Sequence, residues 1–122
     1  MNALLWTLQV LLAVIFTASG LAKISWPKDR LIATGQTGVA PFPLPVIRVT
    51  AFCELLGAVG LLLPSLVGVA DYLTPLAAGG FVIVMAGAIG SHTYLREPRS
   101  VALNIVILIA ATTVAVGRSL GL

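Results

Sequence analysis

Charged residues are scarce in this sequence. Its 122 residues include only four acidic and seven basic side chains, so that 9% of the chain is charged and 59% is hydrophobic. Soluble domains are typically about 25% charged and about 45–50% apolar, whereas the mean hydropathy here is +1.10. This composition excludes an ordinary soluble domain. It predicts a single integral membrane domain over residues 1–122, surrounded by the lipid bilayer.

Cysteine and histidine occur only once each, as Cys53 and His92. A lone cysteine excludes an internal disulfide and a CxxC redox pair. One thiol and one imidazole are too few for a metal site built from protein ligands alone, and the sequence has no haem-ligand pair or nucleotide motif. We therefore expect no metal site and no intrinsic cofactor. A role in electron transfer would need a redox centre on a partner protein.

The net charge of +3 does not indicate a nucleic-acid partner. The basic residues lie mostly in short connecting segments rather than on one basic face, which is typical of residues that set membrane topology. Most of them fall in segments 23–44 and 92–99, whereas Arg118 alone lies on the opposite side. The positive-inside rule then predicts that both loops are cytoplasmic and that both termini lie outside.

Four apolar runs, at about residues 3–22, 45–64, 72–91 and 100–117, have the length of transmembrane helices, since a span needs roughly 20 apolar residues. No basic residue precedes the first run, and we interpret it as a retained helix rather than a cleaved signal peptide. Short loops join most of the neighbouring runs. The sequence therefore predicts an all-α fold, an antiparallel bundle of four transmembrane helices.

Prolines and glycines are expected to shape these helices. Alternate prolines at Pro41, Pro43 and Pro45 cannot lie inside a helix, so segment 23–44 is predicted to be an extended or re-entrant loop at the membrane interface. Pro64 is predicted to end the second span. Close packing of helices in lipid needs small residues. The small residues expected on packing faces are Gly57, Gly60, Gly79, Ala86, Gly87, Gly90, Ser91, Ala111 and Ala115.

Glu54 is the only acidic residue inside an apolar run. An unpaired charge at the centre of a span costs ~2.5–3.5 kcal/mol on insertion scales, so Glu54 is the first candidate for a functional residue. Arg48 lies six residues earlier, about 240° around the helix, and is not expected to pair with Glu54 directly. A partner must come from another helix, and Lys23 and His92 are the candidates.

Each of the four predicted helices contributes a polar side chain to the same half of the bundle. The candidate site residues are Glu54, Lys23, His92, Asn104 and Arg48. Two interpretations remain open for this cluster. It is either a buried structural network that fixes the fold or the polar floor of a ligand pocket.

The sequence resembles the DoxX and DoxX-like family of small four-helix membrane proteins. The resemblance lies in Ser19-Gly20-Leu21-Ala22-Lys23-Ile24 at the end of the first helix, in Glu54-Leu-Leu-Gly57 after a proline-ended loop, in His92 and in Asn104. It covers essentially the whole chain. The resemblance implies that Lys23, Glu54, His92 and Asn104 are recurring polar positions, and it assigns no catalytic residue.

The functions that this resemblance implies are varied. The founding member is a membrane subunit of a thiosulfate:quinone oxidoreductase. Some relatives belong to membrane oxidoreductase complexes linked to thiol and superoxide defence, and more distant ones are assembly factors or cargo receptors. The resemblance thus implies an accessory subunit of a quinone-linked oxidoreductase in the plasma (bacterial inner) membrane, with a quinone as ligand and a redox partner protein.

Two other classes of function stay open. The first is a non-catalytic protein that binds a lipid or another lipophile, or that assists the assembly of membrane proteins. The second is transport of a small solute, which is less favoured because four short helices show no inverted repeat or broken helix. A homo-oligomer would weaken that objection, and the sequence leaves oligomerisation open.

Overall fold

Four long helices make up most of the chain in the computed structural model, which describes residues 2–122. They are α1 (Asn2–Ser25), α3 (Leu44–Val67), α4 (Leu73–Tyr94) and α5 (Pro98–Ser119). All four are long and apolar enough to cross a membrane. Each predicted span matches one of them to within three residues at either end, so the predicted four-helix bundle is confirmed.

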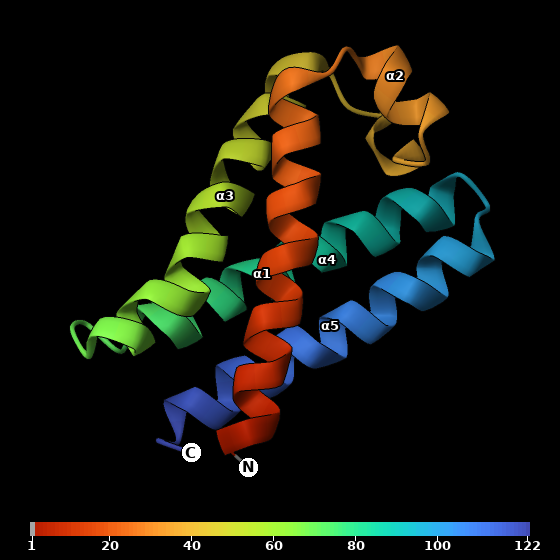
Figure 1. Cartoon of the computed structure of the whole chain (residues 1–122). Coiled ribbons are helices and arrows are strands. Elements are labelled where there is room, and N and C mark those ends of the chain that lie inside the picture. The colour runs from red at the N-terminus through yellow and green to blue at the C-terminus, as the bar shows by residue number, and fades with distance from the viewer. Residues whose placement is uncertain (1) are drawn as a thin grey trace.

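The long helices form two antiparallel hairpins, α1 with α3 and α4 with α5. In Figure 1 the hairpins meet where the two chain termini lie and diverge toward the opposite end. The connector between α1 and α3 lies in the opening between them, as helix α2 (Lys28–Ala33) and the 3-10 turn η1 (Thr37–Val39). The connector therefore closes one end of the space between the hairpins.

The connector differs from the extended loop that its prolines predict. Leu31 and Val39 are buried with Ile47 of α3 in a small apolar cluster, against which Trp26 packs. Burial of these side chains stabilises a short helix and a 3-10 turn in place of extended backbone. Pro45 lies in the first turn of α3, where its missing N–H would have no helical partner in any case.

The prediction that Pro64 ends the second span is wrong, because α3 continues through it to Val67. Proline has no N–H for the carbonyl group four residues earlier, which here belongs to Gly60. The hydroxyl of Thr74, at the start of α4, donates to that carbonyl oxygen at 3.1 Å. This bond from α4 replaces the missing one, and the helix ends instead at Val67, just before Gly68, whose φ is +70°.

Glycines of α3 allow close contacts with α4. A Cβ atom on Gly57 would lie 2.6 Å from Cζ of Phe81, and one on Gly60 would lie 3.0 Å from Cβ of Ala77. The Phe81 ring in turn stacks on Phe16 of α1, with ring centroids 3.9 Å apart. The prediction of a packing face on the second span is therefore confirmed.

The glycines of α4 do not form the packing face that their spacing predicts. Added Cβ atoms on Gly79, Gly80, Gly87 and Gly90 would meet nothing within 4 Å. Their spacing alone does not tell whether the face they share points toward a neighbouring helix or toward lipid. In this protein it points away from the other helices that the structure describes.

A second polar cluster joins the first and last helices at the end that carries the termini. Arg118 donates from Nε to Oε1 of Gln9 at 2.7 Å and from Nη1 to Oδ1 of Asn2 at 2.8 Å. Gln9 is fully buried and donates from Nε2 to the Leu61 carbonyl at 2.6 Å. The sequence did not predict this cluster, because Gln9 is uncharged and Arg118 lies beyond the predicted span.

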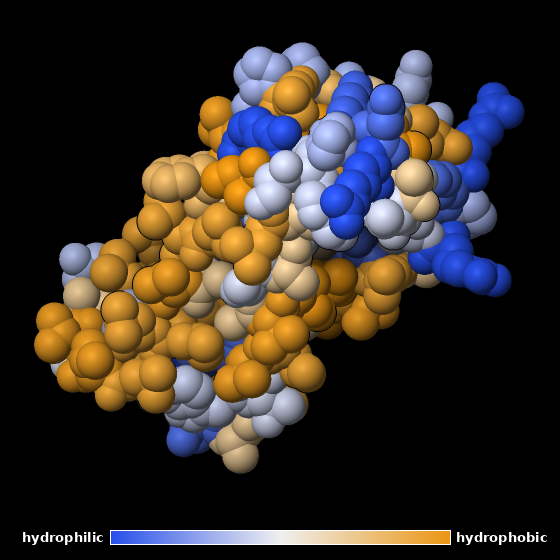
Figure 2. Space-filling model, turned by 45° about the horizontal axis from the view of Figure 1, so that its top comes forward, coloured by the Kyte–Doolittle hydropathy of each residue, from blue (hydrophilic) through white to orange (hydrophobic). Residues whose placement is uncertain are grey.

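The surface matches a position within a bilayer. Figure 2 shows apolar side chains over the long helices and polar side chains gathered mainly at the end that carries the connector. Exposed leucine, isoleucine and valine side chains occur on all four long helices, which is unfavourable in water and expected in lipid. The chain is an integral membrane protein.

Candidate functional site

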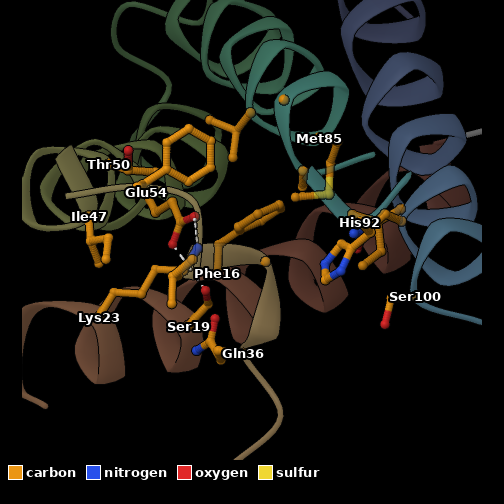
Figure 3. A pocket seen from close by; sticks show the side chains of 18 of the residues that line it. Phe16, Ser19, Lys23, Gln36, Ile47, Thr50, Glu54, Met85, His92 and Ser100 are labelled. Atoms are coloured by element: carbon orange, nitrogen blue, oxygen red, sulfur yellow. Dashed lines mark hydrogen bonds and ion pairs between the residues drawn. The ribbon is translucent and has the colours of Figure 1, made fainter. Parts of the chain in front are cut away.

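A cavity of about 430 Å³ lies between the two hairpins, beneath the connector. Its lining comes from all four long helices and from the connector, and it includes four of the five candidate residues: Lys23, Glu54, His92 and Asn104. Phe16, Ile47 and Met85 supply part of its apolar wall (Figure 3). The predicted convergence of polar side chains in one half of the bundle therefore coincides with a cavity, called here the connector pocket.

Glu54 lies at the floor of the connector pocket and is fully buried. Lys23 Nζ lies 2.8 Å from its Oε1, and the Ser19 hydroxyl donates to Oε2 at 3.1 Å (Figure 3). Both carboxylate oxygens therefore have partners on α1. A buried carboxylate is stable only when it is paired and hydrogen-bonded, and this arrangement meets both conditions.

The structure identifies Lys23 as the partner of Glu54, and His92 is not in contact with it. Ser19 was not among the predicted site residues. Ser19 and Lys23 are four residues apart and so lie on one face of α1, which is the signal that would have found it. Lys23 uses one of its three ammonium protons on Glu54, and its side chain is 15% exposed, so it can also donate to a group in the pocket.

Arg48 holds helix ends together rather than lining the pocket. Its Nη1 donates to the backbone carbonyl of Lys23 at 2.5 Å. That carbonyl belongs to the last turn of α1, where carbonyl groups have no helical partner and the helix dipole favours a positive charge. As predicted, Arg48 does not pair with Glu54. It fixes the end of α1 against α3 at Lys23, the same residue whose side chain holds Glu54.

His92 takes part in a different contact, which fastens the connector to α4. Its Nδ1 lies 2.8 Å from Oε1 of Glu97, and the Thr37 hydroxyl of η1 donates to the same oxygen at 2.9 Å. The Ser91 hydroxyl also donates to the Gly38 carbonyl at 2.6 Å. These bonds tie η1 to the end of α4 and so position the roof of the pocket.

The Glu97 carboxylate is stabilised in its charged form by this contact. The hydrogen bonds with His92 and Thr37 lower its pKa below the ordinary value of 4.5. A carboxyl group whose pKa is lower in the folded state stabilises that state above its ordinary pKa. This stabilisation is lost as the pH falls through the lower pKa of the folded state.

We expect the connector to loosen when the pH falls below about 4.5, the ordinary pKa of Glu97. Trp26 packs against the connector cluster, so its fluorescence would follow this change in a Trp6→Phe background, where it is the only tryptophan left. Glu97→Gln removes the titrating group, and this variant should lack the acid transition. If the Trp26 fluorescence of the Glu97→Gln variant changes with pH as it does in the parent Trp6→Phe protein, Glu97 is not the group that titrates.

Two further amide side chains line the pocket. Asn104 of α5, which was predicted, and Gln36 of the connector, which was not, both line the cavity. Neither amide has a hydrogen-bond partner among the side-chain bonds found for residues 2–122. Figure 3 places Lys23 and Glu54 on one side of the pocket and His92 and Ser100 on the other. A bound molecule could thus receive hydrogen bonds from two sides.

No group of three or more histidine, cysteine, aspartate or glutamate side chains that could hold a metal ion occurs within residues 2–122. Cys53 is exposed and does not line the connector pocket. The chemistry of the pocket is therefore that of an ammonium, a carboxylate, an imidazole, two amides and the hydroxyls of Ser19, Thr50 and Ser100 within an apolar wall.

Together, the fold and the pocket define a small integral membrane protein of four helices with a polar pocket at one end of the bundle. A family model described as the DoxX-like family matches residues 7–114, nearly the whole chain. The chain belongs to the DoxX-like family, as its sequence motifs predict. No curated protein and no solved structure matches the chain significantly.

Proposed function

We propose that this protein is an accessory subunit of a quinone-linked membrane oxidoreductase, and that the connector pocket binds the head group of the quinone. The observation that supports the proposal is a cavity of about 430 Å³ with apolar walls and hydrogen-bond donors on two sides. Small-molecule sites typically measure about 300–1,000 Å³ and combine apolar lining with a few placed polar groups.

The residues present fit a quinone head group. Its two carbonyl oxygens lie on opposite edges of a flat ring and both accept hydrogen bonds. Lys23 on one side and the amides of Gln36 and Asn104 elsewhere in the lining are groups able to donate them, and the His92 ring can donate as an imidazolium. Phe16 and Met85 offer aromatic and sulfur surfaces to the ring face.

Each polar residue has a definable role in this proposal. Glu54 is a positioning residue, because its carboxylate is fully buried and holds the ammonium of Lys23. The Glu97 carboxylate favours a proton on Nδ1 of His92, which leaves Nε2 as an acceptor in the neutral ring and as a donor in the imidazolium. A bound quinone would supply two-electron, two-proton chemistry, and the electrons would come from a partner protein that carries the redox centre.

The same proposal includes the setting of the protein. We place it in the plasma (bacterial inner) membrane with loops 23–44 and 92–99 in the cytoplasm and both termini outside, because the basic residues are concentrated in these loops. The connector pocket would then lie near the cytoplasmic surface. A redox partner would bind on that side, where η1 and Glu97 form the roof.

The proposal is tested by native mass spectrometry of the protein in lipid nanodiscs that contain a long-tailed benzoquinone. The wild type should retain one quinone. Glu54→Gln should still insert in the membrane but lose most of it, because Lys23 is no longer held. Asp71→Asn makes the same chemical change at an exposed residue outside the pocket, so it should bind like the wild type.

Other outcomes of this experiment would point to the other functions. If the wild type retains only phospholipid, together with a reproducible partner chain, the protein is a lipophile-binding or assembly protein. If Glu54→Gln and Glu54→Leu both bind quinone and remain as stable as the wild type, the Glu54 site plays no part in function. Solute transport is the least supported alternative, since the connector pocket occupies only one half of the bundle.

A further inference from the structure

Part of the wall of the connector pocket is also the outer surface of the protein. Ile83 and Gly87 of α4 both line the pocket, yet Ile83 is 75% exposed and Gly87 is exposed as well. They are four residues apart and therefore lie one turn apart on the same face of the helix. The pocket is thus open to the outside beside these two residues. This gap in its wall is called here the α4 opening.

The α4 opening faces hydrocarbon rather than water. Gly87 lies seven and Ile83 eleven residues before the end of α4 at Tyr94, which places them roughly 10 Å and 16 Å from that end at the rise of an α-helix. The hydrocarbon core of a bilayer is about 30 Å thick, so both residues lie inside it. Lys23 and His92 lie close to the connector end of α1 and α4.

The pocket therefore differs in polarity between its interior and its exit. Lys23 and His92 lie near the membrane surface, Glu54 and Asn104 lie deeper, ten and six residues into α3 and α5, and the exit beside Gly87 and Ile83 is apolar and lies in the hydrocarbon. An amphiphile has the same two parts, a polar head group and an apolar chain. A wholly water-soluble ligand would have no use for an opening at this depth.

We propose that the α4 opening is a side entrance through which the apolar tail of the ligand extends into the bilayer while the head group occupies the connector pocket. The ligand class is an amphiphile with hydrogen-bond acceptors on its head group and a long apolar chain. The identity of the head group as a quinone rests on the function proposed above, whereas the entrance does not depend on it.

Gly87 offers a direct test because it leaves the opening free. A Cβ atom at Gly87 would meet nothing within 4 Å, so a leucine there fits without a clash and also favours the helix more than glycine does. Its side chain would occupy the path of the tail. Gly80 and Gly90 are also exposed on α4 and equally open, but they do not line the pocket.

The experiment compares wild type, Gly87→Leu, Gly80→Leu and Gly90→Leu in nanodiscs, by native mass spectrometry at increasing mole fractions of quinone. Two probes are used, a long-tailed benzoquinone and a benzoquinone without a tail. Gly87→Leu should bind the tailed quinone about tenfold more weakly or worse and the tail-less one within about twofold of the wild type. The two control variants should bind both probes like the wild type.

The outcomes separate this inference from the proposed function. If Gly87→Leu binds the tailed quinone like the wild type, the entrance is wrong and the quinone function stands. If the wild type retains phospholipid instead of quinone, and only Gly87→Leu loses it, the entrance is supported and the quinone function is wrong. If Gly80→Leu and Gly90→Leu weaken binding equally, the effect comes from the outer face of α4 and the entrance is overturned.

Discussion

Replacing Lys23 with methionine should lower the free energy of unfolding by about 3–5 kcal/mol, the usual cost of removing one partner of a buried ion pair. Glu54 is fully buried, and without Lys23 its charge would keep only the hydrogen bond from Ser19, at 3.1 Å. The same side chain pair also joins α1 to α3. The loss should therefore appear in the cooperative unfolding of the whole bundle.

The measurement is reversible unfolding in mixtures of a mild detergent and sodium dodecyl sulfate, followed by circular dichroism. Lys28→Met is the matched control, because the ammonium of Lys28 donates to the Phe42 carbonyl at the exposed surface. That variant should lose about 1 kcal/mol or less. Equal losses for Lys23→Met and Lys28→Met would show that the ion pair does not hold α1 against α3.

A double variant tells whether the pair serves stability or the ligand. Lys23→Met with Glu54→Leu replaces both charges by apolar groups, which is often neutral or stabilising for a buried pair. We expect it to regain most of the stability that Lys23→Met loses while it still binds no quinone. A double variant that is stable and binds quinone like the wild type would leave the pair without a functional role.

The fold and the key residue of the site were both predictable from the sequence, for the same physical reason. In lipid, a span must be apolar over about 20 residues, and a charge within it must have a partner. Composition therefore predicted the four helices. The free-energy cost of an unpaired carboxylate in lipid predicted that Glu54 matters and that it has a partner on another helix. The cost argument left Lys23 and His92 as equal candidates, and only the structure distinguishes them.

The roof of the pocket was not predictable in this way. Thr37 and Glu97, which share a hydrogen bond, lie 60 residues apart in the sequence, and both belong to segments whose fold depends on the bundle beneath them. Hydropathy carries little information about such segments, because they lie at the interface. Local proline rules predicted extended backbone there, and burial of Leu31 and Val39 overrode them.

Glycine spacing illustrates the same limit within the helices. Small residues at intervals of three or four occur on both α3 and α4, and the pattern predicts a packing face on each. Of these two sets, only the α3 glycines are in close contact with another helix. The spacing predicts that one face of a helix carries only small side chains. The arrangement of the two hairpins determines whether another helix packs on that face.

This difference between the α3 and α4 glycines leads to a second prediction with a large effect on stability. Gly57→Val should destabilise the protein by about 1–3 kcal/mol or more, the usual cost of overpacking a core. The new Cβ would lie 2.6 Å from Cζ of Phe81, and the Phe81 ring cannot move away freely because it stacks on Phe16. The gain in helix propensity on replacing glycine is at most about 1 kcal/mol and does not offset this cost.

Gly80→Val provides the matched control, since a Cβ at Gly80 would meet nothing within 4 Å. It should be as stable as the wild type or slightly more stable in the same detergent unfolding assay. Phe16 also lines the connector pocket, so the displaced rings should reduce the affinity for the tail-less benzoquinone in Gly57→Val alone. If Gly57→Val and Gly80→Val have the same free energy of unfolding, α3 and α4 do not pack through Gly57 and Phe81 as described. The position of Phe16 in the wall of the connector pocket would then be wrong as well.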